Sequence, residues 1–559
     1  MSAAPPSAAR PIAPLLTLHH PATSRRFYDA GLWRSETFYD LLSAHAAARP
    51  NAFAIRDSGR RLTWAEFQAL VDRISGHLAD AGLRPGERVG LRLSNRIEGV
   101  AALLAAARLG AVANPSLHQN YTAREAIGLV TAIDAKVVLA EDGFGVDAAT
   151  ADFAGMADSL ASVRRVIRLP AGRSGGGLLD APVAVPPKRD DPDAICYLVF
   201  TSGTTGQPKG VTHSANTLLA NARDMVRDWG HDASTVLLSL SPLTHHIAWV
   251  ATAQALACGG ELVLNDPPKG MATLDWLLES RATYVMGVPT HAMDIQAEVR
   301  QRGLQRLGDV RVFYMAGAPI PPAVAKAFRA LDVLPQNVYG MSENSSHQYT
   351  QPTDSDAVIV STCGRGGPAY SVKIVDQDNP DLDAQPGEIG QIAGHGACLM
   401  LGYFANQAAT EASFNKDGWF LSGDLGRLDA NGNLEVTGRL KDIIIRGGHN
   451  IHPAKIEDIA VAHPAIAKAA AFPHADDRLG ERVCLAVIPA AGQPAPDADQ
   501  VLRHLAAGGL SRNHMPEYFI VLPEFPLTAS GKILKRGLVD QLKAGAFTPA
   551  PCRYTPPAT

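Results

Sequence analysis

Short apolar segments alternate with helical segments over about the first 420 residues, and no other feature restricts the fold as strongly. A helix is predicted at RLTWAEFQALVDRISGHLADAG, starting after Thr63 and ending at Gly82, with Phe67, Leu70 and Ile74 on one face. Strands are predicted at ERVGLRL, AKVVLA, CYLVF and VRVFYMAG. Apolar strands that alternate with helices are typical of parallel sheets covered on both faces. The predicted fold class is therefore α/β, with parallel sheets flanked by helices.

The pattern changes near residue 420 to that of a small α+β unit. A hairpin is predicted at LGRLDANGNLEVTGR, with Asn431-Gly432 in the turn. The chain has 559 residues, whereas single cores stop growing at about 250–300. We therefore expect a large N-terminal domain over residues 31–440 and a small mobile α+β domain over residues 441–559. Residues 1–30, rich in Pro, Ala and Ser, are predicted to be a poorly ordered leader.

Composition excludes several classes of protein. The net charge of −4 and the charged fraction of 19% provide no basic excess for nucleic acid. No apolar run approaches the roughly 20 residues that a membrane span needs, and the N-terminus lacks the pattern of a secretory signal. The six cysteines are scattered without C-x-x-C spacing, so we expect no metal site built from them and a reduced, cytoplasmic location.

One segment, YLVFTSGTTGQPKG, begins as a buried strand and continues as a loop of glycines and hydroxyl side chains. Glycines let a backbone approach a ligand closely, and hydroxyl groups with one lysine suit a polyphosphate. The loop residues singled out are Thr201, Ser202, Gly203, Thr204, Thr205, Gly206 and Lys209. A flexible turn is the alternative, but the preceding strand and the lysine favour a phosphate-binding loop.

Two better-known motifs are excluded. The P-loop of NTPases ends in Gly-Lys-Ser or Gly-Lys-Thr, whereas Lys209 is followed by Gly210. The nucleophile elbow of serine hydrolases ends in glycine, whereas the nearest match here, Gly340 to Asn344, ends in asparagine. The sequence therefore supports neither of these two chemistries.

Four further clusters accompany the loop. They are YGMSEN at residues 339–344, SGD at 422–424, GRLKDIIIRGGHN at 438–450 and PLTASGKILKR at 526–536. Each cluster is weak evidence alone, but their occurrence together in this order is specific. The chain resembles the adenylate-forming superfamily of acyl- and aryl-CoA synthetases, peptide-synthetase adenylation domains and firefly luciferase. Within it, the chain looks most similar to cyclohexanecarboxylate-CoA ligases, and the resemblance covers nearly the whole chain.

The resemblance implies that a carboxylic acid is activated by ATP and Mg²⁺ and then transferred to CoA. It implies that the hydroxyl-rich loop holds the β- and γ-phosphates and that Glu343, assisted by Thr201, contacts magnesium. Asp424 would accept the ribose hydroxyls and Arg439 would fix the same sugar. Lys532 would bridge the acid's carboxylate and the α-phosphate during adenylation. The residues implied to line the adenine are Gly317, Ala318, Pro319, Asn337, Tyr339, Gly340, Met341 and Ser342.

The resemblance also implies a second conformation for the transfer step. The C-terminal domain would turn about a hinge at Lys441, so that Lys532 leaves the site and another face of the same domain takes its place. Gly447 and Gly448 would then shape a tunnel for the pantetheine thiol of CoA. Arg446 is the residue expected to contact a phosphate of CoA.

The sequence constrains the expected acid pocket less than it constrains the expected nucleotide site. His245 corresponds to the gating histidine between the acid site and the thiol tunnel, with an ordinary core histidine as the alternative. The other expected walls are His246, Trp249, Ala316, Gly340, Ser345, Ser346 and His347. None is Lys or Arg, so we expect a compact monocarboxylic acid: alicyclic such as cyclohexanecarboxylate, aromatic, or of short or medium chain. A longer chain and a homodimeric assembly are left open.

Three alternative functions are kept beside CoA ligation, two of them in more detail. The acyl group could be delivered to the phosphopantetheine of a carrier protein, but no carrier domain is fused here, which favours free CoA. The chain could also be a non-catalytic adenine-nucleotide sensor. Retention of Lys532 together with Glu343 and Asp424 argues against a sensor, because a sensor has no need of the bridging lysine. Light emission by an oxidative reaction is a third, less favoured alternative.

Overall fold

The computed structural model describes two compact units of the chain. The described residues are 18, 20–173, 181–201, 208–318, 320–446, 449–528 and 532–555. The N-terminal unit consists of the described parts of Met1–Thr201, Pro208–Ser371 and Gly396–Ala412, and the C-terminal unit of Val372–His395 and the described part of Ser413–Thr559. Residues 413–440, which the sequence analysis assigned to the large domain, therefore belong to the compact C-terminal unit. The border at 440/441, as the limit of a moving part, stays a prediction.

Helix α1 (Pro21–Asp29) lies within the segment that the sequence analysis assigned to a poorly ordered leader. Pro21 suits its first turn, where a missing N–H costs no intrahelical hydrogen bond. The Tyr28 hydroxyl donates to the Asp193 carboxylate at 2.9 Å, and Asn216 donates to Tyr28 at 3.0 Å. These contacts with the rest of the N-terminal unit fix the helix, so the leader prediction does not hold for residues 21–29.

The first sheet of the N-terminal unit has six strands in the order β6-β5-β3-β4-β7-β8. All neighbours are parallel except β7 and β8, which form a hairpin. The strands are β3 (Arg88–Arg92), β4 (Val112–Asn114), β5 (Ala135–Glu141), β6 (Arg165–Leu169), β7 (Ile195–Thr201) and β8 (Lys209–Ser214). The helices α4 (Ile97–Arg108), α5 (Ala123–Ala132) and α6 (Phe153–Asp158) connect them. This sheet confirms the α/β prediction and carries the hydroxyl-rich loop between β7 and β8.

The second sheet of this unit has eight strands in the order β14-β13-β12-β11-β9-β10-β1-β2. Only the two edge pairs, β1 with β2 and β13 with β14, are antiparallel. The strands are β1 (Phe53–Arg56), β2 (Arg61–Thr63), β9 (Val236–Ser239), β10 (Glu261–Leu264), β11 (Tyr284–Gly287), β12 (Val312–Ala316), β13 (Leu334–Met341) and β14 (Ser345–Tyr349). The hairpin at the β14 edge contains the YGMSEN cluster.

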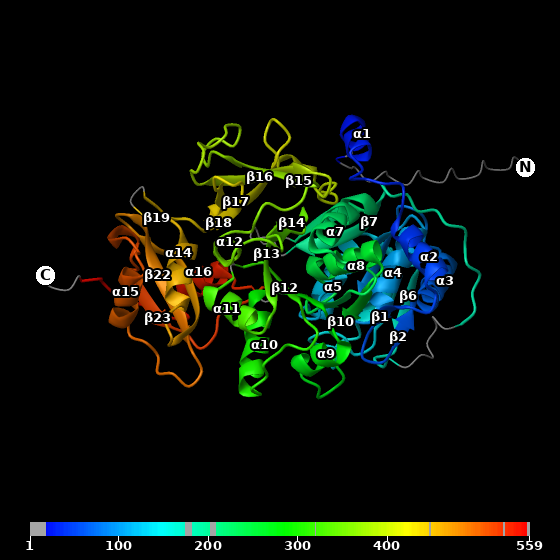
Figure 1. The fold of residues 1–559 in the computed structure, drawn as a ribbon, viewed down its shortest axis with the longest axis horizontal. Coiled ribbons are helices and arrows are strands. Elements are labelled where there is room, and N and C mark those ends of the chain that lie inside the picture. The colour runs from blue at the N-terminus through cyan, green and yellow to red at the C-terminus, as the bar shows by residue number, and fades with distance from the viewer. Residues whose placement is uncertain are drawn as a thin grey trace, which may run out of the picture. The chain divides into compact units, whose positions relative to one another are not determined.

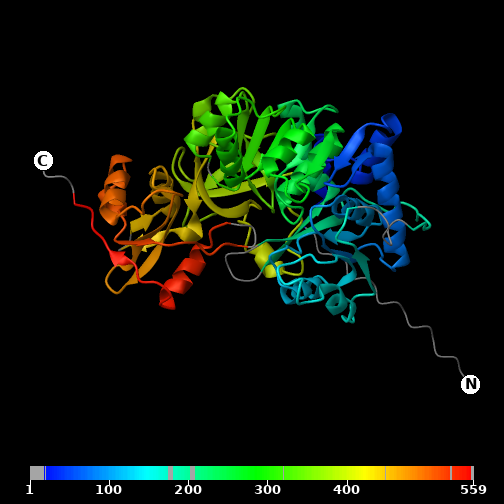
Figure 2. The same ribbon diagram turned by 90° about the horizontal axis from the view of Figure 1, so that it is seen from below.

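Helices cover both sheets. They are α2 (Phe38–Ala48), α3 (Trp64–Asp80), α7 (Ala215–Trp229), α8 (His246–Cys258), α9 (Thr273–Ser280), α10 (Pro289–Gln301), α11 (Pro322–Ala330), α12 (Asp356–Ser361) and α13 (Gln407–Glu411). Helices α7 and α8 pack side by side (Figure 1). The green helices α9 to α11 and the cyan elements of the first sheet lie on opposite sides of this unit (Figure 2). The predicted helix after Thr63 is α3, whose cap is a reciprocal pair of hydrogen bonds between Thr63 and Glu66.

The C-terminal unit contains two sheets (Figure 1). The first, in the order β15-β16-β17-β18, comprises β15 (Tyr370–Val375), β16 (Gly390–Gly396), β17 (Phe420–Leu428) and β18 (Leu434–Arg439). The second has the order β20-β19-β22-β23-β24, with β21 paired to β22. Its strands are β19 (Ile444–Arg446), β20 (His449–Ile451), β21 (Ile466–Asp476), β22 (Gly480–Pro489), β23 (Tyr518–Val521) and β24 (Ala550–Pro551). Helices α14 (Pro453–Val461), α15 (Ala498–Ala507) and α16 (Lys535–Lys543) complete the unit.

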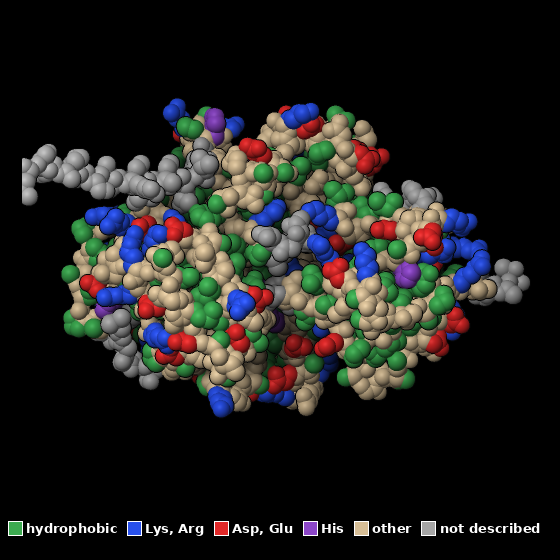
Figure 3. Space-filling model, turned by 180° about the vertical axis from the view of Figure 1, so that it is seen from behind, with side chains coloured by type: hydrophobic (Ala, Val, Ile, Leu, Met, Phe, Trp, Pro, Cys, Tyr) green, Lys and Arg blue, Asp and Glu red, His purple; other side chains and the backbone are tan. Residues whose placement is uncertain are grey.

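Lys and Arg side chains are interspersed with Asp and Glu on the face shown in Figure 3. Among the described helices, none combines the length and the apolar character that crossing a bilayer requires.

Candidate active site

The ends of the hydroxyl-rich loop are fixed by the β7–β8 hairpin. Thr201 and Lys209 lie opposite each other in the register of the two strands, and Thr201 Oγ1 is 3.5 Å from the carbonyl oxygen of Lys209. The remaining loop residues of the prediction, Ser202, Gly203, Thr204, Thr205 and Gly206, lie outside the described residues. The hairpin therefore accounts for the position of the lysine relative to the first hydroxyl of the loop.

A line of contacts joins Lys209 to Glu343. Lys209 Nζ lies 4.5 Å from the centroid of the Tyr403 ring, a cation–π distance. The Tyr403 hydroxyl donates to Glu343 Oε1 at 2.8 Å. Tyr403 is itself held by a bridge to Val211 on β8. The structure thus brings together two predicted site residues that are 134 positions apart, and it adds Tyr403, which the sequence analysis missed.

Glu343 lies in a tight turn between β13 and β14. A side chain at Gly340 would place its Cβ 1.7 Å from the carbonyl oxygen of Ser345, so only glycine fits there. Ser345 has a φ of 57°, in the left-handed region that few non-glycine residues adopt. Asn344 Oδ1 accepts from the Met341 N–H at 3.0 Å and closes the turn. These constraints point a carboxylate that is only 9% exposed toward Tyr403.

The donor set around Glu343 fits a magnesium ion that arrives with a nucleotide. Magnesium prefers oxygen ligands and usually binds through one or two carboxylates plus substrate phosphates. Within the described residues there is no group of three or more His, Cys, Asp and Glu side chains that could hold a metal by themselves. A single buried carboxylate that Tyr403 links to Lys209, the lysine at the end of the hydroxyl-rich loop, is consistent with that kind of site.

A cluster of neutral polar side chains surrounds the start of α8. His246 Nδ1 is 3.3 Å from the Tyr197 hydroxyl, and its Nε2 is 2.9 Å from Ser345 Oγ. The His213 ring stacks on His246 at 5.4 Å and donates from Nε2 to the Ser342 carbonyl at 2.6 Å. Burial lowers the pKa of His213 to about 4 and that of His246 well below its ordinary value. Both rings are therefore neutral at physiological pH.

The other expected pocket walls lie on α8, β12 and β14. His347 is buried between the rings of Tyr339 and Tyr370, at centroid distances of 5.4 and 4.2 Å. Burial lowers the pKa of His347 to about 3. Two of the wall residues form hydrogen bonds: Ser346 Oγ with the Tyr314 hydroxyl, and Trp249 Nε1, as donor, with the Leu243 carbonyl. Ala316 is the last residue of β12.

His245 is the residue that precedes α8 and is half-buried. Its Nε2 is 3.1 Å from Nε2 of His118, which comes from the loop between β4 and α5. The sequence analysis missed His118, because a lone histidine in a connecting loop carries no motif.

The residues expected to line the adenine are only partly available for that role. Gly317, with a φ of 88°, and Ala318 are exposed directly after β12, whereas Pro319 lies outside the described residues. Asn337 is already used inside the protein, because its side-chain amide donates to the carbonyl groups of Ile359 and Thr362 at 2.9 Å each. Its side chain therefore supports the local fold in this structure.

The C-terminal unit pairs the two residues expected at the ribose. Asp424 on β17 and Arg439 on β18 are cross-strand partners, with Arg439 Nε 2.9 Å from Asp424 Oδ1. Ser422 Oγ accepts from the backbone N–H of Asp424 at 3.0 Å and so holds the main chain at the acid. Two motifs predicted separately from the sequence thus meet in one hairpin.

The remaining predicted residues of this unit occupy a short helix, a loop and a strand. Lys441 lies in the 3₁₀-helix Leu440–Asp442. Lys532 is exposed, and its backbone forms hydrogen bonds of 2.8 and 3.1 Å with Thr528 across the loop. Arg446 forms a two-point ion pair with Glu517 at 2.7 and 2.9 Å, so its guanidinium already has an anionic partner. Gly447 and Gly448 lie outside the described residues.

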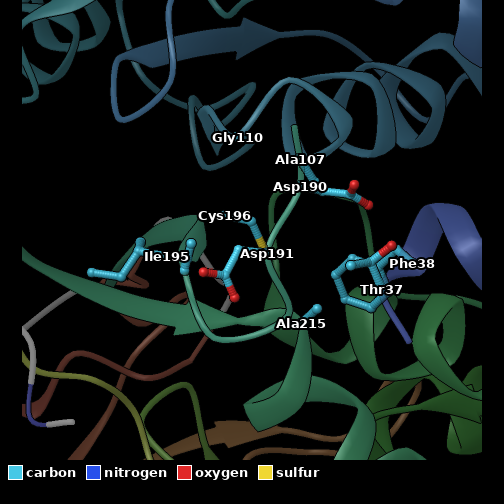
Figure 4. Close-up of a pocket in the computed structure, with 10 residues that line it drawn as sticks. Thr37, Phe38, Ala107, Gly110, Asp190, Asp191, Ile195, Cys196 and Ala215 are labelled. Atoms are coloured by element: carbon cyan, nitrogen blue, oxygen red, sulfur yellow. The ribbon is translucent and has the colours of Figure 1, made fainter. Parts of the chain in front are cut away.

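Two hollows in the N-terminal unit lie apart from these residues. The cavity in Figure 4, with a volume of about 10 Å³, has room for one water molecule and is lined mainly by apolar atoms. A larger hollow of about 340 Å³ lies against the end of β5 and the start of α6. Neither contains a predicted site residue, so neither is the candidate active site.

Comparison with known proteins identifies the family. A model of the AMP-binding enzyme family matches residues 42–404, and a model of the AMP-binding enzyme C-terminal domain matches residues 455–532. The chain belongs to the AMP-binding enzyme family. It is therefore a member of the adenylate-forming superfamily, of the acyl- and aryl-CoA synthetase class, as the sequence motifs indicated.

Individual members of the AMP-binding enzyme family are similar along most of their length. The chain is 28% identical to a medium-chain fatty-acid–CoA ligase of Escherichia coli K12, covering 90% of each chain. It is 30% identical to a salicylyl-CoA synthase / salicylate adenylyltransferase of a Streptomyces species, covering 93% of this chain and 96% of the relative. The ATP-bound crystal structure of MatB from Rhodopseudomonas palustris superposes with a TM-score of 0.80 at 26% identity, covering 92% of this chain and all of the other.

Proposed function

We propose that this AMP-binding enzyme is a carboxylic acid–CoA ligase for a compact monocarboxylic acid. The observation that supports the proposal is the line of contacts from Lys209, at the end of the hydroxyl-rich loop, through Tyr403 to Glu343. One positive charge and one buried carboxylate suit the phosphates and the metal ion of a magnesium nucleotide, respectively.

The proposed reaction has two steps. The acid's carboxylate oxygen attacks the α-phosphorus of ATP, so that an acyl–phosphate bond forms and pyrophosphate leaves. The thiol of CoA then attacks the acyl carbon, a thioester forms and AMP leaves. The first step brings two anions together, and the role proposed for Lys532 is to reduce their repulsion. Bound magnesium would supply charge neutralisation at the phosphates, with Glu343 as its proposed protein ligand.

The walls proposed for the acid pocket favour a neutral acyl group. His246, Ser345 and Tyr197 satisfy one another by hydrogen bonds, and the histidine is neutral. Such a wall offers no cation to a second carboxylate, but it accepts an apolar ring or chain or a neutral hydroxyl group. The relatives named for a medium-chain fatty acid and for salicylate are consistent with this class.

Delivery to a carrier-protein phosphopantetheine is the second candidate for the transfer step. One relative carries both names, salicylyl-CoA synthase and salicylate adenylyltransferase, so release of the adenylate to another acceptor is compatible with the family. The thiol acceptor therefore needs its own measurement.

Product analysis tests the proposal. The protein is incubated with ATP, Mg²⁺ and a panel of benzoate, salicylate, cyclohexanecarboxylate and octanoate, with and without CoA. We expect AMP and pyrophosphate as products, and a CoA thioester only when CoA is present. ADP as the main nucleotide product would reject the assignment, and adenylate formation without a CoA thioester would favour the carrier-protein alternative.

A further inference from the structure

Two histidines from separate parts of the N-terminal unit share one hydrogen bond. His118 lies in the loop between β4 and α5, and His245 precedes α8, 127 residues later. Their Nε2 atoms are 3.1 Å apart, and their rings meet edge to face at a centroid distance of 5.0 Å. One of the two nitrogens must carry a proton and the other must accept it.

The surroundings of His118 decide which nitrogen is the donor. The backbone N–H of Asn120 donates to His118 Nδ1 at 3.0 Å, so Nδ1 is an acceptor without a proton. Neutral His118 therefore carries its proton on Nε2 and donates it to His245. Neutral His245 in turn accepts on Nε2 and carries its own proton on Nδ1. The contacts thus specify the tautomers of both rings.

Arg92 on β3 favours the neutral form of His118. Its guanidinium donates to the backbone carbonyl groups of His118 and Tyr121 at 3.0 and 2.8 Å. Burial first, and then the Arg92 charge, lower the pKa of His118. The Tyr121 ring is edge-on to the His118 ring at 6.2 Å, and the carboxylates of Glu125 and Asp147 interact electrostatically with Arg92. A positive charge on His118 would therefore face a buried arginine.

We propose that His118 is a positioning residue for the CoA-dependent half-reaction, a proposal that rests on the proposed function. It holds His245, the proposed gate of the thiol path, in one orientation and as the neutral Nδ1–H tautomer. His245 then presents a hydrogen-bond donor, and not a proton acceptor, from its second ring nitrogen. His118 itself touches neither acid nor nucleotide in this proposal.

The proposal predicts a specific dependence on pH. Protonating His245 at Nε2 would break the bond to His118 and set two N–H groups against each other, so the pair opposes a proton at this nitrogen. Without the His118 donor this opposition disappears. The rate of thioester formation falls on the acidic side of its pH profile. This fall, the acid limb, therefore moves to higher pH in a variant that lacks the donor.

Three variants test the proposal in the full-length protein. His118→Leu removes the donor, His118→Gln keeps an N–H donor, and Gln119→Leu is a matched control at the exposed neighbouring position. Acid-dependent pyrophosphate exchange and thioester formation from supplied acyl-adenylate are measured separately across about pH 5 to 8, the range in which histidines titrate. Thermal melts accompany each variant.

The expected pattern separates positioning from general damage. For His118→Leu we expect pyrophosphate exchange within about twofold of wild type and thioester formation reduced roughly threefold to tenfold, the order expected for one lost hydrogen bond. Its acid limb moves to higher pH. His118→Gln recovers most of the rate, and Gln119→Leu matches wild type. An unmoved acid limb, or equal loss in both half-reactions, overturns the proposal.

A spectroscopic measurement keeps the test decisive if His118→Leu does not fold. Wild-type protein labelled with the heavy nitrogen isotope in histidine reports which ring nitrogens carry protons, and the His118→Gln spectrum assigns the His118 signals. We expect a protonated Nε2 and a bare Nδ1 on His118, and the opposite pattern overturns the proposal. Wild-type protein that forms no thioester with any acid or acceptor would instead reject the proposed function, whatever the tautomers.

Discussion

At the scale of single residues, side chains from separate parts of the chain form hydrogen-bonded or ionic pairs. Glu343 accepts from Tyr403, and Asp424 is paired with Arg439 across a hairpin. The tyrosine hydroxyl and the guanidinium therefore give each of these two acids a partner within the protein itself.

Lys532→Ala tests the role proposed for the bridging lysine. Loss of a preorganised cation at a developing charge typically reduces a rate by about 10²–10³. We expect that loss in acid-dependent pyrophosphate exchange, with thioester formation from supplied acyl-adenylate largely preserved. Lys543→Ala, an exposed lysine at the end of α16, is the matched control and should leave both rates unchanged. Equal damage to both half-reactions would mean that Lys532 is structural or acts in both steps.

Sequence reasoning found the residues that stand in dense motifs and missed those that stand alone. Glu343 and Asp424 lie within runs of glycine, hydroxyl and acidic residues that predict a site without any structure. Tyr403 and His118 lie in segments with no such density, and only the folded chain brings them to Glu343 and His245. A pattern of spacings cannot reveal a contact that depends on the packing of three separate segments.

At the scale of elements, the junction after β18 combines a short helix with an ion-pair cluster. Lys535 on α16 lies 2.8 Å from Glu457 on α14 and 3.8 Å from Asp442 in the 3₁₀-helix. The segment that follows the Lys532 loop is thereby tied to the segment that contains Lys441. This arrangement suits a hinge, because the elements on its C-terminal side are linked and can move together.

Lys441→Pro tests the hinge. Proline fixes φ at position 441 near the value typical of a 3₁₀-helix and also restricts the preceding Leu440, so the substitution limits the backbone changes that a hinge requires. We expect a normal thermal melt, retained pyrophosphate exchange, and thioester formation reduced by orders of magnitude. Lys441→Ala, which leaves the backbone free, should show neither loss. A Lys441→Pro variant with both activities intact, or with both reduced in proportion, would place the hinge elsewhere.

Strands were predicted well where the apolar pattern is strong. The turn between two strands was predicted poorly, because side-chain hydrogen bonds determine its length. Strands β3, β5, β7 and β12 coincide with the apolar runs. The hairpin after residue 420 exists, but a five-residue connection replaces the expected two-residue turn, and within it only Gly432 has a positive φ. The reason is local: the Asp429 carboxylate accepts from the N–H groups of Asn431 and Asn433 and builds a wider loop.

At the scale of the whole molecule, the α/β class could be predicted from the sequence, whereas the acyl substrate could not. The class follows from the alternation of strands and helices, which recurs through most of the N-terminal unit. The substrate depends on a few side chains of the acid pocket. For the two proposed here, His246 and Ser345, only the fold reveals the hydrogen bond between them. A chain of this family can therefore be assigned its reaction class from sequence well before its acid.

Buried neutral histidines make the stability of the N-terminal unit depend on pH, and this is a prediction for the whole molecule. Burial lowers the pKa of His213 and of His231 to about 4 and that of His347 to about 3, against about 6.5 in an unfolded chain. Between these values the unfolded state binds more protons than the folded state, so stability rises with pH. The stabilisation is complete above about pH 6.5 and is lost as the pH falls toward 4.

We therefore expect the unfolding temperature of the N-terminal unit to fall as the pH is lowered from about 6.5 to about 4 at constant ionic strength. His231→Gln supplies the matched test, because His231 packs edge-on against Tyr284 and carries none of the proposed site roles. Removing one of these titrating groups should reduce the slope of unfolding temperature against pH, whatever its effect on stability at neutral pH. Calorimetric melts at several pH values measure both slopes. Equal slopes for the two proteins, or a flat profile in the wild type, would mean that these histidines are not held neutral by the fold.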